Sequence, residues 1–269
     1  MRTIWIASAL LWIVAPLAAQ PPAGLGASAL TRPDFTWSMD SVPGVRAYFL
    51  RGTYADIHRD SLLRRLPDAV AHARAMIAAP AAPGPIDVFF VERREQMQAL
   101  TGANATGFAH TSARAVFLVT NPDWRAFERH EIMHVVSVQA WGRDGMSKAW
   151  LLEGLAQAAD GSCGGHTNEA IAIALASRSG WIDLATLVHR FREQSDLRAY
   201  LQAAAFTDYL LRNAGVEPLR ELWVAEADTS TRVRGRTLAD WEREWRGTLA
   251  RSSGVPASTI ERVELKGCG

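Results

Sequence analysis

Two histidines and a glutamate lie close together near the middle of the sequence, in His130-Glu131-Ile132-Met133-His134. In a helix of 3.6 residues per turn, His130 and His134 lie one turn apart on the same face. Two imidazoles placed in this way can bind one zinc ion at Zn–N distances of about 2.0–2.1 Å. Glu131 lies about 100° further round the helix, where its carboxylate can take a proton from a metal-activated water. The spacing therefore predicts hydrolytic chemistry at a zinc ion.

A mostly apolar helix is expected around this motif. Asn121-Pro122-Asp123 supplies a capping side chain, a proline for the first helical position and an acid for the first turn. Gly142 would end the helix. Its apolar residues are Trp124, Phe127, Ile132, Met133, Val135 and Val136. Because a charged Glu131 is costly in a buried helix unless a cation compensates it, this context favours a metal site over a chance motif.

A third candidate ligand follows eighteen residues after His134, in Trp150-Leu151-Leu152-Glu153-Gly154-Leu155-Ala156. A turn is expected from Gly142 to Gly145, after which Ser147 can cap a second helix that Gly161 ends. If the second helix folds back on the first, Glu153 faces the two histidines. Taken alone, Glu153 would be a solvated helix acid, but beside the first motif it is predicted to bind metal.

The combined motif, H-E-x-x-H and then W-x-x-E-G-x-A, resembles the gluzincin metallopeptidases, the group that includes thermolysin and the zinc aminopeptidases. The spacing is similar to that of the aminopeptidase branch. The resemblance implies that His130, His134 and Glu153 are zinc ligands. It also implies that Glu131 is the general base and then the proton shuttle. The motif spans residues 130–156, and weaker similarities extend further.

One of these weaker similarities concerns a tyrosine. Residues 200–210 resemble the aminopeptidase segment in which a tyrosine opens a Y-x-K-G helix and stabilises the oxyanion of the tetrahedral intermediate. Tyr200 matches the tyrosine, whereas Gln202 and Ala203 replace the Lys and Gly. The alternative is that Tyr200 only packs on the core at a helix start. His166, which follows two glycines, is the other candidate for the oxyanion donor.

Two further features depart from the pattern of this family. Thermolysin-like enzymes place an aspartate four residues after the ligand glutamate, where it orients a zinc histidine. Gln157 stands there in this sequence, so the orientation is weaker or comes from another residue, with Asp160 as the candidate. No G-x-M-E-N-like motif precedes the zinc motif, and recognition of a substrate amino terminus is therefore not supported.

The elements that must position these residues predict an α+β protein, and their order resembles the sheet-bearing lobe of zincins. We expect a small mixed sheet with helices in the N-terminal lobe, an active-site helix pair and an all-helical C-terminal lobe. By the resemblance, the strand at 115–119 would be the edge strand along which an extended peptide lies. Pro67 is expected to kink or end the first long helix. The predicted strands are 46–51, 86–91 and 115–119, and the predicted helices are 60–79, 94–100, 168–176, 183–191, 196–213, 218–225 and 238–250.

The domain organisation follows from composition. Residues 1–19 resemble a signal peptide, with one early basic residue, an apolar run too short for a comfortable bilayer span, and small residues at its end. Residues 20–45 are expected to be a flexible lead-in, rich in Pro, Gly, Ala and Ser. Residues 46–160 form the catalytic lobe with the zinc site. Residues 161–269 form the helical lobe and its tail.

The only two cysteines, Cys163 and Cys268, most simply form one disulfide in an exported protein. This bond would attach the C-terminal tail to the loop after the Glu153 helix. The alternative, that the cysteines bind zinc, is weaker because they are far apart and a fuller ligand set already exists. The tail from Gly254 onward shows no long apolar periodicity.

The charges are nearly balanced, with 29 basic and 28 acidic residues and a net charge of +1, so nothing favours a nucleic-acid partner. We expect an exported (periplasmic or secreted) monomeric zinc metallopeptidase that acts on a peptide or protein substrate, with no membrane span after signal cleavage. Two alternatives stay open: an inactive gluzincin-fold binding protein, and a helical secreted protein with a chance motif. Metal content separates the second alternative from the others, and turnover separates the enzyme from the binding protein.

Overall fold

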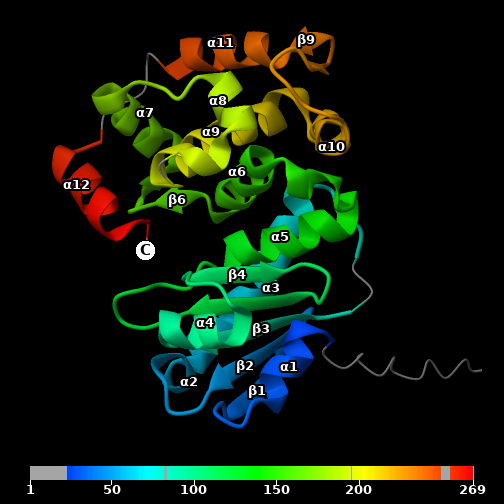
Figure 1. Cartoon of the computed structure of the whole chain (residues 1–269), viewed down its shortest axis with the longest axis vertical. Coiled ribbons are helices and arrows are strands. Elements are labelled where there is room, and N and C mark those ends of the chain that lie inside the picture. The colour runs from blue at the N-terminus through cyan, green and yellow to red at the C-terminus, as the bar shows by residue number, and fades with distance from the viewer. Residues whose placement is uncertain (1–22, 82–83, 195, 250–254, 269) are drawn as a thin grey trace, which may run out of the picture.

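The computed structural model describes residues 23–81, 84–194, 196–249 and 255–268, so the predicted signal peptide lies outside the described residues. The described part is an α+β protein with a small mixed sheet at one end and a cluster of helices at the other (Figure 1). The helix that carries the histidine motif lies between them. No helix in this described part is both long and apolar enough to cross a bilayer.

The sheet has five strands in the order β1-β2-β3-β5-β4. Strand β3 is parallel to both of its neighbours, while the two outer pairs are antiparallel. The inner strands β3 and β5 are buried at every position, as their unbroken apolar sequences predict for strands covered on both faces. The strands are β1 (Trp37–Val42), β2 (Val45–Leu50), β3 (Ile86–Val91), β4 (Gly107–His110) and β5 (Ala115–Val119).

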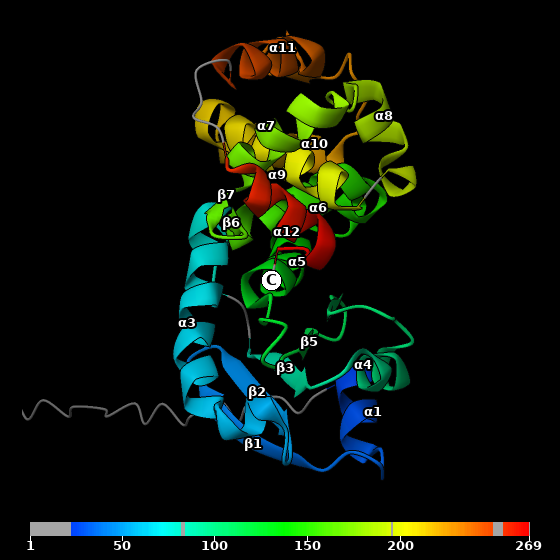
Figure 2. The same cartoon turned by 90° about the vertical axis from the view of Figure 1, so that its left-hand side faces the viewer.

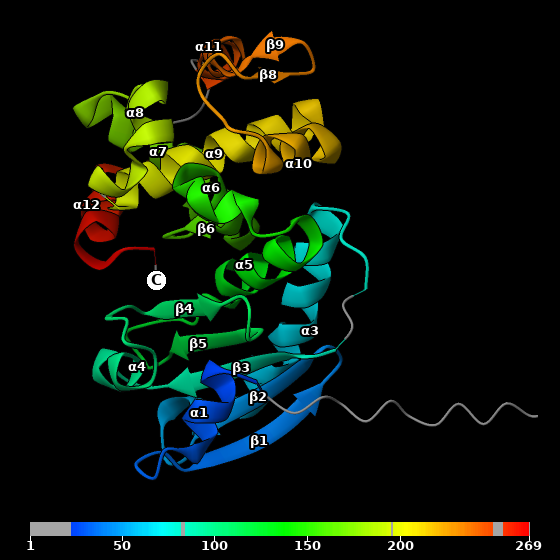
Figure 3. The same cartoon turned by 45° about the vertical axis from the view of Figure 1, so that its right-hand side comes forward.

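Two groups of helices cover the two faces of the sheet, as Figure 3 shows. Helices α3 (Arg59–Met76) and α5 (Glu128–Trp141) pack on the face that continues into the helical half. Helices α1 (Leu25–Thr31) and α4 (Arg94–Thr101) cover the other face. The short helix α2 (Tyr54–Ile57) follows β2. This layering leaves α5 in contact with both the sheet and the helical half.

The prediction that the strand at 115–119, which is β5, forms the edge of the sheet is wrong. Strand β5 pairs with β3 on one side and with β4 on the other, so β4 forms the edge of the sheet. Strand β4 is short, starts with Gly107 and is only half-buried, and it therefore lacks the apolar run that marks a strand in sequence. Its pairing with β5 across a tight turn holds it in place. In that turn Arg114 has a φ of 53°.

The prediction of a flexible lead-in at residues 20–45 is also wrong for the described part of this range, which contains α1 and β1. The indole nitrogen of Trp37 donates a hydrogen bond of 3.1 Å to the carbonyl of Ala29. The Trp37 ring also contacts the Phe89 ring, with centroids 5.3 Å apart. These contacts attach a polar, glycine-rich stretch to the core.

Helix α3 continues through Pro67 instead of ending there. Its buried residues lie on both sides of the proline, so packing against the sheet and α5 stabilises both halves of the helix. Figure 2 shows α3 running lengthwise from the sheet towards the helical half.

The helical half is built around α9 (Asp196–Ala214), which packs against α6 and α7. Contrary to an all-helical lobe, the described residues also form two short hairpins, β6–β7 and β8–β9, and a last helix that was not expected from the sequence. The elements are α6 (Ala149–Asp160), β6 (Ser162–Cys163), β7 (His166–Thr167), α7 (Asn168–Ser179), α8 (Leu184–His189), α10 (Val216–Val224), β8 (Arg232–Val233), β9 (Arg236–Thr237), α11 (Leu238–Leu249) and α12 (Ala257–Lys266).

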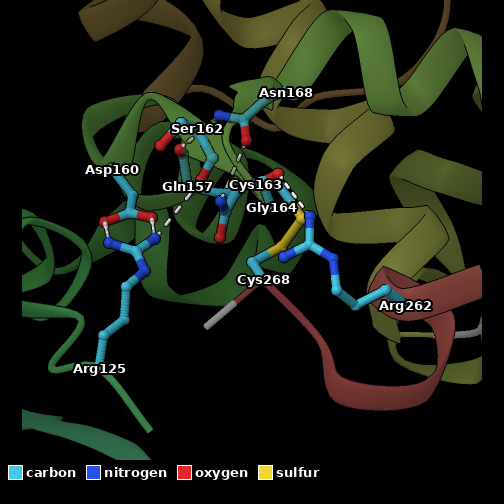
Figure 4. The surroundings of a disulfide bond; sticks show 9 residues. All are labelled: Arg125, Gln157, Asp160, Ser162, Cys163, Gly164, Asn168, Arg262 and Cys268. Carbon is cyan, nitrogen blue, oxygen red and sulfur yellow. Dashed lines mark hydrogen bonds and ion pairs between the residues drawn. A yellow bond between two sulfur atoms is a disulfide. The ribbon is translucent and has the colours of Figure 1, made fainter. Parts of the chain in front are cut away.

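The predicted disulfide between Cys163 and Cys268 is confirmed (Figure 4). It joins β6 to the residues after α12. Arg262 on α12 also donates a hydrogen bond of 2.9 Å to the carbonyl of Gly164. Gly164 has a φ of 57°, and a Cβ there would lie 2.6 Å from a methyl group of Val263. Glycine at this position therefore lets α12 approach the β6–β7 hairpin closely.

Gly154→Ala is expected to destabilise the protein by about 1–3 kcal/mol, because overpacking a closely packed interface forces the backbone to shift. A Cβ at Gly154 would lie 2.8 Å from the carbonyl oxygen of Ala203, at the contact of α6 with α9. Urea unfolding measures the change. The control is Gly247→Ala on α11, where a Cβ meets nothing within 4 Å and is expected to leave stability equal or slightly raised. If both substitutions changed the free energy of unfolding equally, the close packing of α6 against α9 at Gly154 would be contradicted.

Candidate metal centre

Helix α5 presents the motif, but it begins at Glu128 and not at the cap expected near Asn121. The Asn121 side chain instead accepts hydrogen bonds from the backbone N–H groups of Asp123 and Trp124, at 2.9 and 3.0 Å. Its amide also donates to the carbonyl of Glu92 at 2.8 Å. The Asn-Pro-Asp sequence therefore forms a tight turn after β5, since the same side chain can cap a turn or a helix.

The reversal between α5 and α6 brings the third acidic residue back to the histidines. Gly142, with a φ of 87°, ends α5, and its carbonyl accepts a 3.0 Å hydrogen bond from the Trp223 indole. A Cβ at Gly145 would clash with the Trp223 ring, so glycine is required there. The turn prediction is confirmed. The predicted cap is not, because the Ser147 hydroxyl donates to the carbonyl of Asp144 within a 3₁₀ turn, and α6 starts after Lys148.

His130, His134 and Glu153 converge on one point. The two Nε2 atoms are 3.2 Å apart, and Oε2 of Glu153 lies 3.4 Å from Nε2 of His130 and 3.3 Å from Nε2 of His134. Ligand atoms around a tetrahedral metal with bonds of about 2.0–2.1 Å are about 3.3–3.4 Å apart. The two histidines are each 8% exposed. This group can hold a metal ion.

The surroundings of Glu153 favour the ionised form of its carboxyl group. Although burial opposes its ionisation, the nearby rings of His134 and His130 hold the pKa of Glu153 below its usual range. It is therefore an anion beside two imidazole nitrogens, and these three groups make up the donor set of a three-ligand metal site.

Glu131 lines the same cavity but does not belong to the group of three candidate ligands. It is 7% exposed, and its burial raises its pKa to about 7, against the lowering effect of His130. A Cβ at Gly107, the first residue of β4, would lie 2.3 Å from Oε1 of Glu131. The edge strand thus passes directly over this carboxylate, and only glycine leaves room for it.

The cavity has a volume of about 710 Å³, and all five predicted site residues line it, including Tyr200. Tyr200 lies on α9, and its ring centroid is 6.3 Å from that of His130 and 5.2 Å from that of Phe191. The tyrosine therefore packs on an aromatic neighbour and also faces the candidate metal centre.

The other two candidates do not reach this site. His166 lies in β7, opposite Cys163, and is not among the described residues that line the cavity. Asp160 forms an ion pair with Arg125, as Figure 4 shows, and so it does not orient a histidine. Gln157 lines the cavity and donates a 3.2 Å hydrogen bond to Asn168. Nδ1 of His134 is buried and has no partner among the described groups.

Sequence reasoning missed several residues of the cavity. Strand β4 forms one wall, and Arg94 and Arg192 add two positive charges. The guanidinium of Arg94 lies over the Trp124 ring, 4.9 Å from its centroid. Arg192 lies in a short 3₁₀ helix, Phe191–Glu193. Neither arginine has a spacing relation to the motif, so only the fold reveals them.

Among known proteins, no family model and no curated sequence matches this chain.

Proposed function

We propose that this protein is an exported zinc-dependent peptidase of the gluzincin type with a zincin-like fold. The observation that carries the proposal is the convergence of two imidazole nitrogens and one carboxylate oxygen at 3.2–3.4 Å from one another. A second carboxylate, Glu131, lies in the same cavity without belonging to this set. Three protein ligands beside a free carboxylate are the arrangement of a hydrolytic metal site.

The donor set supports zinc over other ions. Calcium and magnesium prefer oxygen ligands, whereas imidazole suits zinc, copper, iron and nickel. In square-planar or octahedral coordination with bonds of about 2.0–2.1 Å, neighbouring ligand atoms would be only about 2.8–3.0 Å apart. The larger separations in this site support a tetrahedral ion.

Each residue then has a chemical task. His130, His134 and Glu153 would hold the zinc ion, which when bound lowers the pKa of a water molecule and polarises the carbonyl group of a substrate. Glu131 accepts the proton of the attacking water and delivers it to the departing amine. Tyr200, which also lines the cavity, would donate a hydrogen bond to the oxygen on which negative charge develops.

Strand β4 supplies a surface for an extended peptide. Among the described strands it is the edge of the sheet, it is half-buried, and it lines the cavity beside Glu131. An edge strand binds a peptide by adding it as a further strand, through main-chain hydrogen bonds. A peptide added to β4 would pass close to the candidate metal ligands, which supports peptides as the substrate class.

The disulfide supports export. Bonds such as Cys163–Cys268 form and persist in oxidising compartments, in agreement with the signal-like composition of residues 1–19. The periplasm and the extracellular space both meet this condition.

Metal analysis tests the proposal. Protein purified without chelator is expected to contain about one zinc ion per chain. His134→Ala is expected to lose the metal, because only two ligands remain, and to lose turnover with it. His166→Ala, which changes a histidine outside the cavity, is the matched control and should keep the metal. Wild-type protein that holds no zinc after refolding with the metal would refute the enzymatic function, and a peptide-library digest then identifies a substrate.

Tyr200→Phe is expected to lower the turnover number by about 10²–10³, since an oxyanion donor is lost, while zinc content stays unchanged. The matched control is Tyr209→Phe on the same helix. Its hydroxyl donates a 2.9 Å hydrogen bond to Glu244, and it does not line the cavity in the described structure. Steady-state kinetics on one peptide compares the two variants. An unchanged rate in Tyr200→Phe would assign the oxyanion to another donor and leave Tyr200 as a packing residue.

A further inference from the structure

A second cavity, of about 430 Å³, lies at the C-terminal half of α5. Its walls come from the end of α3 with the residues that follow it, from the turn between β4 and β5, and from residues 136–143 of α5 and beyond. Helices α3 and α5 lie side by side in this region, as Figures 1 and 3 show. The three walls are far apart in sequence.

Three arginines line this cavity: Arg74 on α3, Arg114 in the β4–β5 turn and Arg143 after α5. None of the described residues that line it is acidic. Thr111, Ser112 and Gln139 add polar groups that can donate hydrogen bonds. The cavity therefore collects three positive charges and several donors without a carboxylate to neutralise them.

Two of these guanidinium groups each keep one unsatisfied nitrogen, although Nη2 of Arg114 donates a hydrogen bond to the carbonyl of Gly84. The Nε atoms of Arg74 and Arg114 are buried and have no hydrogen-bond partner among the described groups. Burial, and then the nearby charge of Arg74, lower the pKa of Arg114. The carboxylate of Asp87 also acts on Arg114, but it already accepts two hydrogen bonds from Arg46, at 2.6 and 2.9 Å. A buried N–H donor on a charged group costs free energy when it has no acceptor. An anion bound in the cavity would supply acceptors for these donors.

We propose that Arg74, Arg114 and Arg143 form a binding site for an oxyanion of the carboxylate or phosphate class. Guanidinium groups match such anions because their parallel N–H groups meet two oxygens at once. Hydroxyl donors from Thr111 and Ser112 can satisfy the remaining oxygens.

The position of the site suggests two sources for the anion. Thr111 lines both this cavity and the candidate metal centre, so the two cavities adjoin at the end of β4. A free phosphate ion can fill the site independently of the metal. Alternatively, an acidic group of a peptide that lies along β4 reaches the arginines, and only this second source rests on the proposed peptidase function.

Calorimetric titration of the full chain with inorganic phosphate, against sodium chloride at equal ionic strength, tests the first source. Loss of one charged donor is expected to weaken phosphate binding roughly tenfold in Arg143→Gln and in Arg74→Gln. Arg143 is exposed, and its replacement is expected to leave folding intact, as urea unfolding checks. Arg220→Gln, an exposed arginine on α10, is the matched control with unchanged affinity. His134→Ala should bind phosphate as the wild type does, because the metal ligands are not part of this site.

Two otherwise identical peptides that carry either Glu or Gln at one position test the second source. Tighter binding of the Glu peptide to the wild type, with the preference lost in Arg143→Gln, assigns the anion to the substrate. Phosphate binding without such a preference assigns it to a free oxyanion. The proposal is overturned if neither phosphate nor the Glu peptide distinguishes the wild type from the Arg74 and Arg143 variants. That result would leave the zinc content, and with it the proposed function, unaffected.

Discussion

Glu131→Gln is expected to keep its metal and to lose about 10²–10⁴ in peptide turnover, because an amide cannot accept the proton of the attacking water. Gln has nearly the same shape, so the contact with Gly107 and the positions of the three ligands should be kept. Zinc analysis and kcat/KM on one peptide, measured on the same preparation, separate loss of the base from loss of the metal.

The control for this variant lies on the same helix. Glu128 is also a buried acid of α5, but it pairs with Arg65 at 3.2 Å and is not among the described lining residues of the metal cavity. Glu128→Gln is therefore expected to keep most of its turnover. If Glu131→Gln kept the wild-type rate, the proton would have to pass to another group and the mechanism proposed for this site would be wrong.

Loss of the disulfide is expected to have the largest effect on stability. The Cys163–Cys268 bond joins residues 105 positions apart. In the chain-entropy model a loop of this length contributes about 4.7 kcal/mol, and removal of a native disulfide typically lowers the free energy of unfolding by about 2–5 kcal/mol. Cys268→Ala should therefore unfold at a clearly lower urea concentration than the oxidised wild type.

The bond should also affect the metal site, because Cys163 lies three residues after the end of the helix that carries Glu153. Competition with a chelator measures zinc affinity in the oxidised wild type, the reduced wild type and Cys268→Ala. The last two are expected to behave alike and to bind zinc less tightly. Unfolding curves that do not change on reduction would show that hydrogen bonds such as Arg262 to Gly164 already hold α12 without the bond.

The parts of this fold that could be predicted are those whose sequence has one physical interpretation. Strands β3 and β5 are unbroken apolar runs, and such runs between polar loops indicate buried strands. The histidine spacing places both imidazoles on one helical face, and the geometry of the site agrees with that prediction. Gly161 ends α6 in a left-handed conformation, as expected for a glycine after a helix.

The parts that were missed depend on contacts between distant segments. Strand β4 is defined by its pairing with β5, and β1 by the Trp37 contact with Phe89. The predicted start of α5 is too early because the Asn121 side chain can cap a turn as well as a helix, and here it caps a turn. Arg114 and Arg143 come from separate loops, and no spacing rule connects them. Sequence patterns record local geometry, whereas these features arise from tertiary packing.

The approach of Gly107 to Glu131 limits how this protein can evolve or be redesigned. In the proposed peptidase, exchanges at the half-buried residues Phe108 and Ala109 would alter which peptides bind, whereas a Cβ at Gly107 would lie 2.3 Å from Oε1 of Glu131. A methyl group at 107 would displace either the strand or the carboxylate, so substrate preference and proton transfer would change together. In the proposed peptidase, the residue that covers Glu131 is therefore the position of β4 where specificity could not vary without a change in the proton acceptor.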